Sequence, residues 1–540
     1  MVMFPSRFPS VLILPVLLTS MHVQGRAFHF DSRDGTEPAN GLTPATARRT
    51  LATIRNVVLN PGDSLLMRRG SVWTGDSLLL QGYGSASVPW VVGAYGDPAD
   101  PPPSLSNSGR VVTVKKAGHL VVQDLELSGA HGGCIELADS TVSQAVFQRL
   151  DLHHCGGGIY VTGTDIAVLD SRIHDGKMVV NTPAKDDDYG ATGVGLSQVS
   201  GCRVQGNLFW NLIAPSIDYG FDGGAVETWK TVRHCDVSRN LAIGCDGFVE
   251  FGGQKGDSVV DFALHHNVSF GSKLLACLHL ADTNSLFGIG YDSVRFDHNL
   301  VVDRFQTRWG FHVAADGGAP ERLDRIKFRQ NIWVTDSANL IWYQGGRSKD
   351  PTWVHQSNLV WNREHDPFKG DRIAGPGEVY ADPQFTGPWR NGTVDDTVLS
   401  HYGLASGSPA RGTGVDLGYA VDFFGKPYVR GAATDWGPFA PGAFGARLVG
   451  ERKTDGLRAR LEGRTVVVTG NPSAAPVAWR LALVDPAGRK VSSTSSVCSV
   501  GGAAEIRMEG MASGGLVVVH AQADLPDGSR ESLVATLAVP

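Results

Sequence analysis

The chain has 540 residues, of which 48 are basic and 54 are acidic, so its formal net charge is −6. This mild acidity argues against binding to a nucleic-acid backbone, which needs a face rich in Lys and Arg. Charged residues make up only 19% of the chain and Gly occurs 67 times, a composition typical of turn-rich all-β proteins. Apolar residues make up 42%, which is enough for a large core and excludes a disordered chain.

The first 27 residues follow the pattern of a secretory signal peptide. Arg7 precedes a short apolar run at residues 11–18, and the small residues Gly25 and Ala27 fit a cleavage site. The apolar run is too short to span a membrane, and no later stretch reaches about 18 apolar residues. We therefore expect a secreted protein with no membrane span; a buried N-terminal strand is the alternative.

The chain has seven cysteines, which are too few for a disulfide scaffold in a protein of this length. Cys134 could pair with Cys155, or Cys235 with Cys245, and buried free thiols are the alternative in each case. No Cys-x-x-Cys pair indicates a zinc site.

Two markers recur in the same order through the middle of the chain. The first is a Gly-rich turn followed by an apolar-x-apolar strand, as in residues 223–229 and 246–252. The second is a β-rich run that ends in an asparagine followed by an apolar residue, at Asn207, Asn240, Asn267, Asn299, Asn331 and Asn358. Spacings of 27–33 residues predict a β-solenoid in which each period is one coil. Coils stack about 4.8 Å apart, so the asparagines are expected to form a ladder of side-chain amides.

The sequence on either side of these repeats resembles a known superfamily. Residues 28–95 resemble the N-terminal cap of secreted right-handed parallel β-helix proteins of the pectate-lyase-like superfamily, and residues 381–427 resemble the end of such helices. The resemblance implies an all-β fold with an N-terminal cap and first coils at 28–110 and a right-handed parallel β-helix at 111–445. It does not fix the activity, because this fold hosts lyases, hydrolases, esterases and phage tail adhesins.

The pattern changes at about residue 446. Alternating β-rich runs with short turns predict a small C-terminal β-sandwich over 446–540. Residues 485–491 and 512–521 resemble the C-terminal sorting domain of bacterial type IX secretion. This resemblance implies a bacterial protein that secretion machinery delivers to the cell surface or the medium. A plain β-sandwich appendage is the alternative.

The outward positions of the apolar-x-apolar strands predict one line of side chains along one face. In chain order this line is Glu136, Tyr160, Gly195, Glu227, Glu250, His279, His312 and Ile341. Glu227 and Glu250 are 23 residues apart, which is one coil, so we expect them side by side. Two neighbouring carboxylates cannot both ionise freely, and one pKa should rise. Glycoside hydrolysis needs such a pair, one protonated acid and one ionised base or nucleophile.

Two long insertions are expected to form walls beside this pair. They carry Asp186, Asp187 and Asp188 in the first, and Asp218 and Asp222 in the second. An acidic cluster of this kind could bind Ca²⁺, which prefers carboxylate and carbonyl oxygens, and a solvated acidic loop is the alternative. Asp222 could instead supply the catalytic acid or base. The aromatic residues expected as sugar-stacking platforms are Tyr189, Tyr219, Trp229 and Trp309.

Three functions remain open at this point. The first is hydrolysis of an extracellular polysaccharide by Glu227 and Glu250, with Asp222 in reserve and with His279 and His312 binding substrate. The second is β-elimination on a uronate polymer, in which Ca²⁺ would neutralise the substrate carboxylate and Lys230, His279 or His312 would abstract the proton. Acidic residues outnumber basic ones in the predicted groove, which favours hydrolysis. The third is a glycan-binding protein without catalysis.

Overall fold

The computed structural model describes residues 25–440 except 55–56, 185–186, 273, 281–288, 303–312, 318–324, 336–341, 345–353, 363–374, 388–398 and 400. Beyond residue 440 it describes the seven strands that lie between residues 457 and 538. Residues 1–24, which hold most of the expected signal peptide, lie outside the described residues. Among the helices that are described, none has the length and apolar character needed to cross a bilayer.

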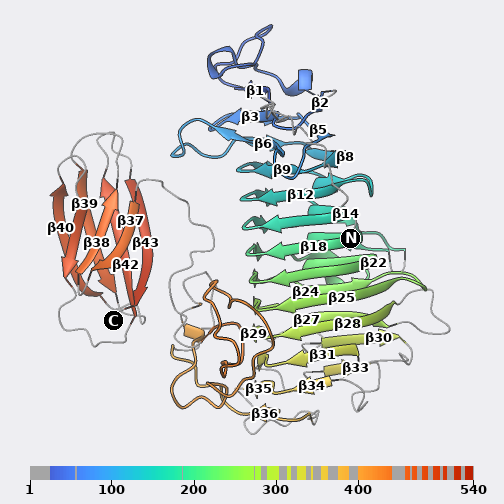
Figure 1. Ribbon diagram of the computed structural model, residues 1–540, viewed down its shortest axis with the longest axis vertical. Coiled ribbons are helices and arrows are strands. Elements are labelled where there is room, and N and C mark those ends of the chain that lie inside the picture. The colour runs from blue at the N-terminus through green and yellow to red at the C-terminus, as the bar shows by residue number, and fades with distance from the viewer. Residues whose placement is uncertain are drawn as a thin grey trace, which may run out of the picture.

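The main body is a parallel β-helix whose coils stack along one axis (Figure 1). Each coil contributes strands to three faces, and the long strands β14, β18 and β22 bend from the first face into the second. The first face contains β2 (Val58–Leu59), β5 (Leu78–Tyr83), β8 (Val112–Gly118), β11 (Gly133–Leu137), β14 (Gly157–Leu169), β18 (Thr192–Gln205), β22 (Gly224–Ser238), β24 (Gly247–Gly252), β27 (Leu274–Leu280), β30 (Val313–Gly317) and β33 (Trp342–Gln344).

The second and third faces complete each coil. The second face continues β14, β18 and β22 and also contains β1 (Ala27–Phe30), β3 (Ser64–Arg68), β6 (Trp90–Tyr95), β9 (Leu120–Gln123), β12 (Ser143–Gln148), β25 (Ser258–His265), β28 (Gly290–Asp297), β31 (Ile326–Arg329) and β34 (Val354–Gln356). The third face contains β4 (Val72–Thr74), β7 (Ser104–Ser106), β10 (Glu126–Ser128), β13 (Asp151–His153), β15 (Arg172–His174), β19 (Leu208–Trp210), β23 (Leu241–Ile243), β26 (Val268–Phe270), β29 (Leu300–Val302), β32 (Ile332–Thr335), β35 (Leu359–Asn362) and β36 (Val379–Tyr380).

The apolar-x-apolar pattern fills the interior of the β-helix, as the sequence predicts. Val194, Val226, Val249 and Ala276 lie in register on successive coils of the first face, and all four are buried. At the N-terminal end, the short 3₁₀ helices η1 (Pro44–Thr46) and η2 (Leu51–Ile54) belong to the cap. Leu51 and Ile54 of η2 are buried against the first coils, which keeps water from the open end of the core.

The predicted asparagine ladder is present at the corner between the second and third faces. Asn240 is typical: its Nδ2 donates to the carbonyl oxygen of Val204 at 2.8 Å and to Oδ1 of Asn267 at 3.0 Å. Its own Oδ1 accepts the backbone N–H of Asn207 at 2.9 Å. The residue before each asparagine has a left-handed backbone, with φ of 71° at Gly206, 57° at Arg239, 51° at His266, 53° at His298, 55° at Gln330 and 55° at Ser357. The buried amide therefore satisfies backbone groups where this tight corner interrupts the strand ladder.

A second apolar core lies on the outer side of the third face. Its strand residues are Leu241, Val268, Phe270, Leu300, Val302, Ile332, Val334 and Leu359. Side chains from residues 399–440, including Tyr402, Phe423, Trp436 and Phe439, pack against them. This segment, whose sequence resembles the end of a β-helix, thus lies along the outside of the coils, where it is drawn in orange in Figure 1.

Two antiparallel sheets make up the described C-terminal part. One sheet contains β37 (Leu457–Glu462), β38 (Thr465–Gly470) and β41 (Ala503–Arg507). The other contains β39 (Val477–Val484), β40 (Lys490–Cys498), β42 (Leu516–Asp524) and β43 (Arg530–Ala538). These strands form the β-sandwich that the sequence predicts. Of the two cysteine pairings left open, the structure contains Cys134–Cys155, whereas Cys235 and Cys245 are buried free thiols.

Candidate active site

The predicted row of outward side chains exists on the first face from Glu136 to Glu250, and Glu227 and Glu250 lie side by side in it. Ile341, predicted at the end of the row, lies outside the described residues. Gly195 on β18 is in register with Glu227 on β22, which is in register with Glu250 on β24. Adjacent strands of a sheet are about 4.8 Å apart, so the two carboxylates are direct neighbours. Oε2 of Glu227 accepts a hydrogen bond from Oγ1 of Thr192 at 2.8 Å.

Asp222 joins the pair from a hairpin that immediately precedes β22. This hairpin consists of β20 (Ala214–Ser216) and β21 (Gly220–Asp222), and the N–H of Gly223 donates to Oδ1 of Asp222 at 2.8 Å. Burial, followed by the charges of Glu250 and Glu227, raises the pKa of Asp222 to about 8. Burial, followed by the charge of Glu250, raises the pKa of Glu227 to about 7. Near neutral pH the cluster can therefore hold protons that isolated carboxylates would have lost.

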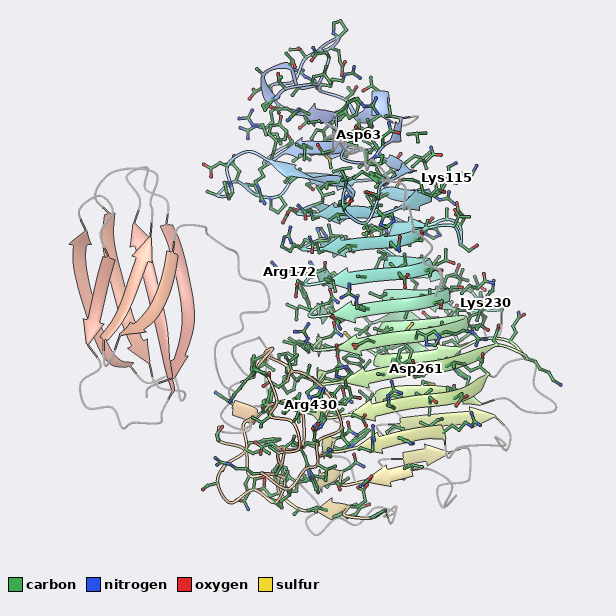
Figure 2. The ribbon with its side chains drawn as sticks, viewed as in Figure 1. Asp63, Lys115, Arg172, Lys230, Asp261 and Arg430 are labelled. Atoms are coloured by element: carbon green, nitrogen blue, oxygen red, sulfur yellow. A yellow bond between two sulfur atoms is a disulfide. The ribbon has the colours of Figure 1, made fainter. Side chains whose placement is uncertain are left out.

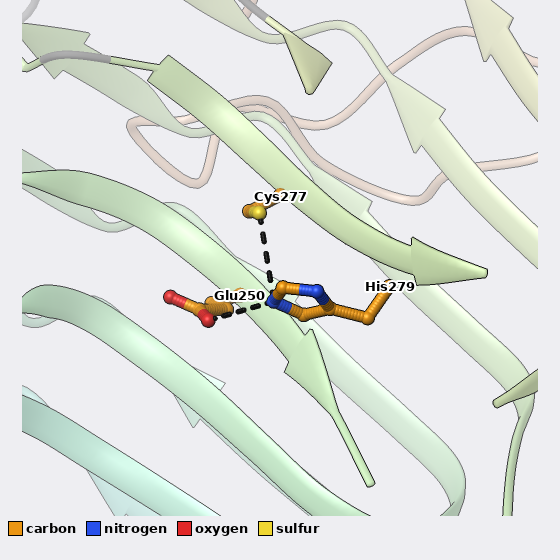
Figure 3. A group of neighbouring side chains, drawn as sticks. All are labelled: Glu250, Cys277 and His279. Carbon is orange, nitrogen blue, oxygen red and sulfur yellow. Dashed lines mark hydrogen bonds and ion pairs between the residues drawn. The ribbon is translucent and has the colours of Figure 1, made fainter. Parts of the chain in front are cut away.

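On the other side of Glu250 the structure corrects the predicted register. Cys277 on β27, and not His279, is in register with Glu250. Both side chains face outward because residues two apart on a strand share a face. Nε2 of His279 lies 2.9 Å from Oε1 of Glu250 and 3.7 Å from Sγ of Cys277 (Figure 3). The sequence misplaced the row here because Leu274 stands where the preceding coils have Gly224 and Gly247.

Tyr160 occupies the coil before Gly195 in the same row. A Cβ built on Gly195 would lie 2.6 Å from Cδ1 of Tyr160, and one built on Gly157 would lie 2.6 Å from its Cζ. The ring thus lies flat over backbone that only glycine allows. Its hydroxyl is buried and has no hydrogen-bond partner among the described residues, and burial raises its pKa well above the usual value. Sequence analysis placed Tyr160 on the row without a role.

Glu136 begins the row but stands apart from the carboxyl cluster. It is in register with Tyr160, and its Oε2 lies 3.2 Å from Nε of Arg110. Its Oε1 also accepts the N–H of Gly133 at 3.3 Å. This ion pair and hydrogen bond give Glu136 local partners away from the other glutamates of the row.

The two predicted acidic insertions meet each other beside the row. Carboxylate oxygens of Asp187, Asp188 and Asp218 lie within 4.8 Å of one another, whereas Asp186 lies outside the described residues. Asp188 Oδ1 accepts the N–H of Thr182 at 2.7 Å, and its Oδ2 accepts the hydroxyl of Ser216 at 2.7 Å. Although burial alone would raise the pKa of Asp188, hydrogen bonds hold it below the usual value. The oxygen ligands suit Ca²⁺ in kind, but protein donors already occupy them.

The other predicted substrate-binding residues are distributed around the row. Tyr189 on β17 (Tyr189–Gly190), which pairs with β16 (Met178–Val180), is 48% exposed, and Tyr219 in the β20–β21 turn is 37% exposed. Trp229 follows Glu227 by two residues on the same face, is 39% exposed and covers Gly252 of the next coil. Lys230 is exposed at the bend of β22, at the edge of the helix in Figure 2. His312 and Trp309 lie outside the described residues.

Comparison with known proteins agrees with this architecture. A family model described as "Right handed beta helix region" matches residues 110–261. Together with the parallel coils, it defines the chain as a right-handed parallel β-helix protein, as the sequence predicts. A search of curated proteins found no relative of this sequence.

Three solved structures to which the chain is similar are proteins with different functions. Pectate lyase Pel9A is 16% identical with a TM-score of 0.48, and the match covers 77% of this chain and 96% of that one. GH136 lacto-N-biosidase from Eubacterium ramulus is 14% identical with a TM-score of 0.41, covering 66% and 68%. PfbA, a surface adhesin of Streptococcus pneumoniae, is 8% identical with a TM-score of 0.35, covering 62% and 90%. A shared fold does not specify an activity, which depends on the residues of the site.

Proposed function

We propose that the chain is an extracellular polysaccharide-degrading enzyme that hydrolyses glycosidic bonds with the carboxyl groups of Glu227, Glu250 and Asp222. The observation that carries this proposal is the convergence of three carboxyl groups from β21, β22 and β24, two of them with raised pKa values. Glycoside hydrolysis needs a protonated acid and an ionised carboxylate on the two sides of the scissile bond. Three neighbouring carboxyl groups that cannot all ionise supply both protonation states.

The environment of each group assigns its role. Glu227, whose pKa is about 7, is the proposed general acid that protonates the leaving oxygen. Glu250, whose Oε1 lies 2.9 Å from Nε2 of His279, is the proposed ionised base or nucleophile. Asp222, whose pKa is about 8, is the second protonated group, either holding a substrate hydroxyl or replacing Glu227 as acid. A carboxyl separation near 5–5.5 Å gives retention of configuration, and a wider one that admits water gives inversion.

The surroundings of the row support a neutral glycan as substrate. Trp229 and Tyr219 expose aromatic faces near the carboxyl groups, and such faces suit the C–H side of a pyranose ring. Asp187, Asp188 and Asp218 add negative charge to the adjoining wall, which would repel a polyanion. The disulfide Cys134–Cys155 is typical of an oxidising compartment and supports export of the protein. The C-terminal β-sandwich is the proposed sorting domain for this export.

The Asp187–Asp188–Asp218 cluster is the observation in favour of the second candidate, a Ca²⁺-dependent lyase. In that reaction Ca²⁺ would neutralise a uronate, and His279 or Lys230 would take the proton. The protein donors on Asp188 argue against it, because a calcium ion would compete with them for the same oxygens.

A panel of neutral and uronate polysaccharides, with and without chelator, separates these functions. We expect new reducing ends without the ultraviolet absorbance of unsaturated uronates. Glu227→Gln and Glu250→Gln should lower the rate by at least about 10²-fold, the usual contribution of a general acid or base. Glu136→Gln is the matched control, because Glu136 lies in the same row outside the cluster, and it should keep the wild-type rate.

Two other results would overturn the proposed hydrolysis. Unsaturated products that disappear with chelator would indicate the lyase. Binding to a glycan without any cleavage, unaffected by Glu227→Gln but lost in Trp229→Ala, would indicate a glycan-binding protein. Circular dichroism and thermal unfolding of each variant check that the coils remain folded.

A further inference from the structure

Glu250, Cys277 and His279 bring three different metal-ligating atoms together on two adjacent strands. The carboxylate oxygen, the thiol sulfur and the imidazole nitrogen all lie within 4.8 Å of one another. Figure 3 shows the imidazole between the other two groups, with its Nε2 directed at both. Nε2 is 2.9 Å from Oε1 of Glu250 and 3.7 Å from Sγ of Cys277.

These separations match a tetrahedral ion of the zinc type. Zinc binds sulfur at about 2.3 Å and imidazole nitrogen or carboxylate oxygen at about 2.0–2.1 Å. Tetrahedral angles then place sulfur and nitrogen about 3.5 Å apart, and nitrogen and oxygen about 3.3–3.4 Å apart. The observed sulfur–nitrogen and nitrogen–oxygen separations of 3.7 Å and 2.9 Å need adjustments of only a few tenths of an ångström. The sulfur and the carboxylate oxygen lie within 4.8 Å of each other, and rotation of the Glu250 side chain would bring them to the required separation of about 3.5 Å. Calcium and magnesium select oxygen ligands, so the thiol and imidazole point to a softer ion.

The scaffold fixes these ligands before any ion arrives. Cys277 and His279 are two residues apart on β27, so both side chains project from one face. Glu250 is in register with Cys277 on the adjacent strand β24. The hydroxyl of Tyr291 donates to the carbonyl oxygen of His279 at 3.2 Å and supports the end of the strand. The side chains of Glu250 and His279 are 44% and 28% exposed, which leaves access for an ion from solvent.

We propose that Glu250, Cys277 and His279 bind a divalent metal ion of the zinc type, and that Zn²⁺ is the ion that the site binds under physiological conditions. On binding, the Cys277 thiol releases its proton to solvent, because thiolate is the ligand form. A further consequence rests on the proposed function: an ion held by Glu250 withdraws that carboxylate from hydrolysis. Zinc then inhibits the enzyme reversibly.

Titration of the full-length, chelator-treated protein with Co²⁺ tests the site without reference to activity. We expect one Co²⁺ per chain, a thiolate-to-metal charge-transfer band and the ligand-field bands of a tetrahedral ion, all removed by added Zn²⁺. Cys277→Ser should abolish the charge-transfer band, and His279→Asn or Glu250→Gln should weaken binding at least tenfold. His234→Asn is the control, because His234 is an exposed histidine on the second face. No charge-transfer band in the wild type, or a band that survives in Cys277→Ser, would overturn the proposal.

The inhibition is measured separately on whichever polymer the wild type cleaves. Zn²⁺ should reduce hydrolysis and chelator should restore it, and Cys277→Ser should need at least tenfold more Zn²⁺ for the same fractional loss. Stoichiometric Co²⁺ binding with full activity at saturating Zn²⁺ would support the site and overturn the inhibition. Absence of hydrolysis on every polymer would count against the proposed function alone, because the cobalt spectrum reports on the ligands directly.

Discussion

Asp222 is a residue whose surroundings act strongly against its charge. It lies at the end of the β20–β21 hairpin, and burial and the neighbouring glutamates raise its pKa to about 8. In the unfolded chain the same group has a pKa near 3.9. Between these values the folded state binds more protons than the unfolded state, so the free energy of unfolding falls as the pH rises. The cluster therefore lowers stability at the pH where its chemistry is useful.

Asp222→Asn should remove this loss of folding stability. Because the amide carries no charge, the variant should gain about 1–3 kcal/mol of stability relative to wild type at pH 9, and less at pH 4. Denaturant unfolding of both proteins at the two pH values measures this difference. A gain that is equal at pH 4 and pH 9 would contradict the explanation. The rate of hydrolysis should fall in the same variant, since Asp222 is one of the proposed proton-holding groups.

The sequence could predict part of this site because of how its residues are spaced. Glu227 and Glu250 each follow a glycine turn by three residues, so counting from the turn places them together. Cys277 could not be placed in this way, because its turn begins with Leu274 and both Cys277 and His279 face outward. The approach of Asp222 depends on a hairpin whose bend follows no repeat. The pairing of Asp188 with donors from the second insertion is likewise a long-range contact between loops.

At the scale of the element, the asparagine ladder is the feature that sequence spacing predicts most completely. The requirement for an amide at these coils is physical, because each side chain donates both to the preceding coil and to the next one, while its oxygen accepts from the preceding coil. Asn267, for example, donates to the carbonyl oxygen of Val237 at 2.8 Å and to Oδ1 of Asn299 at 3.1 Å. Its Oδ1 accepts the N–H of Asn240 at 3.0 Å. A hydroxyl has a single proton to donate and cannot make both donations of the amide, and an aliphatic side chain can make neither.

Asn267→Ala should destabilise the β-helix by about 3–5 kcal/mol. The substitution leaves the N–H of Asn240 and the carbonyl oxygen of Val237 buried without these partners, at about 1–3 kcal/mol each, and it adds a small cavity. Urea denaturation followed by circular dichroism measures the change. Asn60→Ala, at an exposed position, should stay within about 0.5 kcal/mol of wild type. If the two substitutions changed the free energy of unfolding equally, the asparagine ladder would not stabilise the β-helix.

At the scale of the whole molecule, buried histidines of the β-helix form hydrogen bonds with the segment at residues 399–440. Nε2 of His266 lies 3.0 Å from the hydroxyl of Tyr428, and Nδ1 of His298 lies 3.2 Å from the carbonyl oxygen of Gly437. The two imidazole rings stack with centroids 4.8 Å apart. Sequence periodicity could not reveal this contact, because it joins residues 139 positions apart with no shared pattern.

Burial gives these histidines a pH dependence of defined sign. Burial lowers the pKa of His298 to about 4 and lowers the pKa of His266 well below its usual value. A positive charge on His298 would lower the pKa of His266 further. In the unfolded chain both histidines have a pKa near 6.5, so the unfolded state binds more protons than the folded state between about pH 4 and pH 6.5. Stability is therefore present above pH 6.5 and is lost as the pH falls toward 4.

His298→Gln should reduce the loss of stability between pH 7 and pH 5 by about 2 kcal/mol, because one titrating group is removed while a donor to Gly437 remains. Denaturant unfolding at the two pH values measures the loss in each protein. Limited proteolysis should show residues 399–440 cleaved first in the wild type at pH 5. His234→Gln, at an exposed position, should behave like wild type, and an unchanged pH response in His298→Gln would contradict the role of this histidine.

The ladder also has a consequence for how such a chain can change over generations. Each asparagine bonds only to the coils directly before and after it, and the interval between asparagines is 27–33 residues. An in-frame duplication of one interval would therefore lengthen the rod and still satisfy every amide. The chemistry does not share this freedom, because Asp222, Glu227, Glu250, Cys277 and His279 occupy consecutive coils. Copying a coil from elsewhere along the rod would leave the site intact, whereas inserting one after Trp229 would part the two glutamates without unfolding the protein.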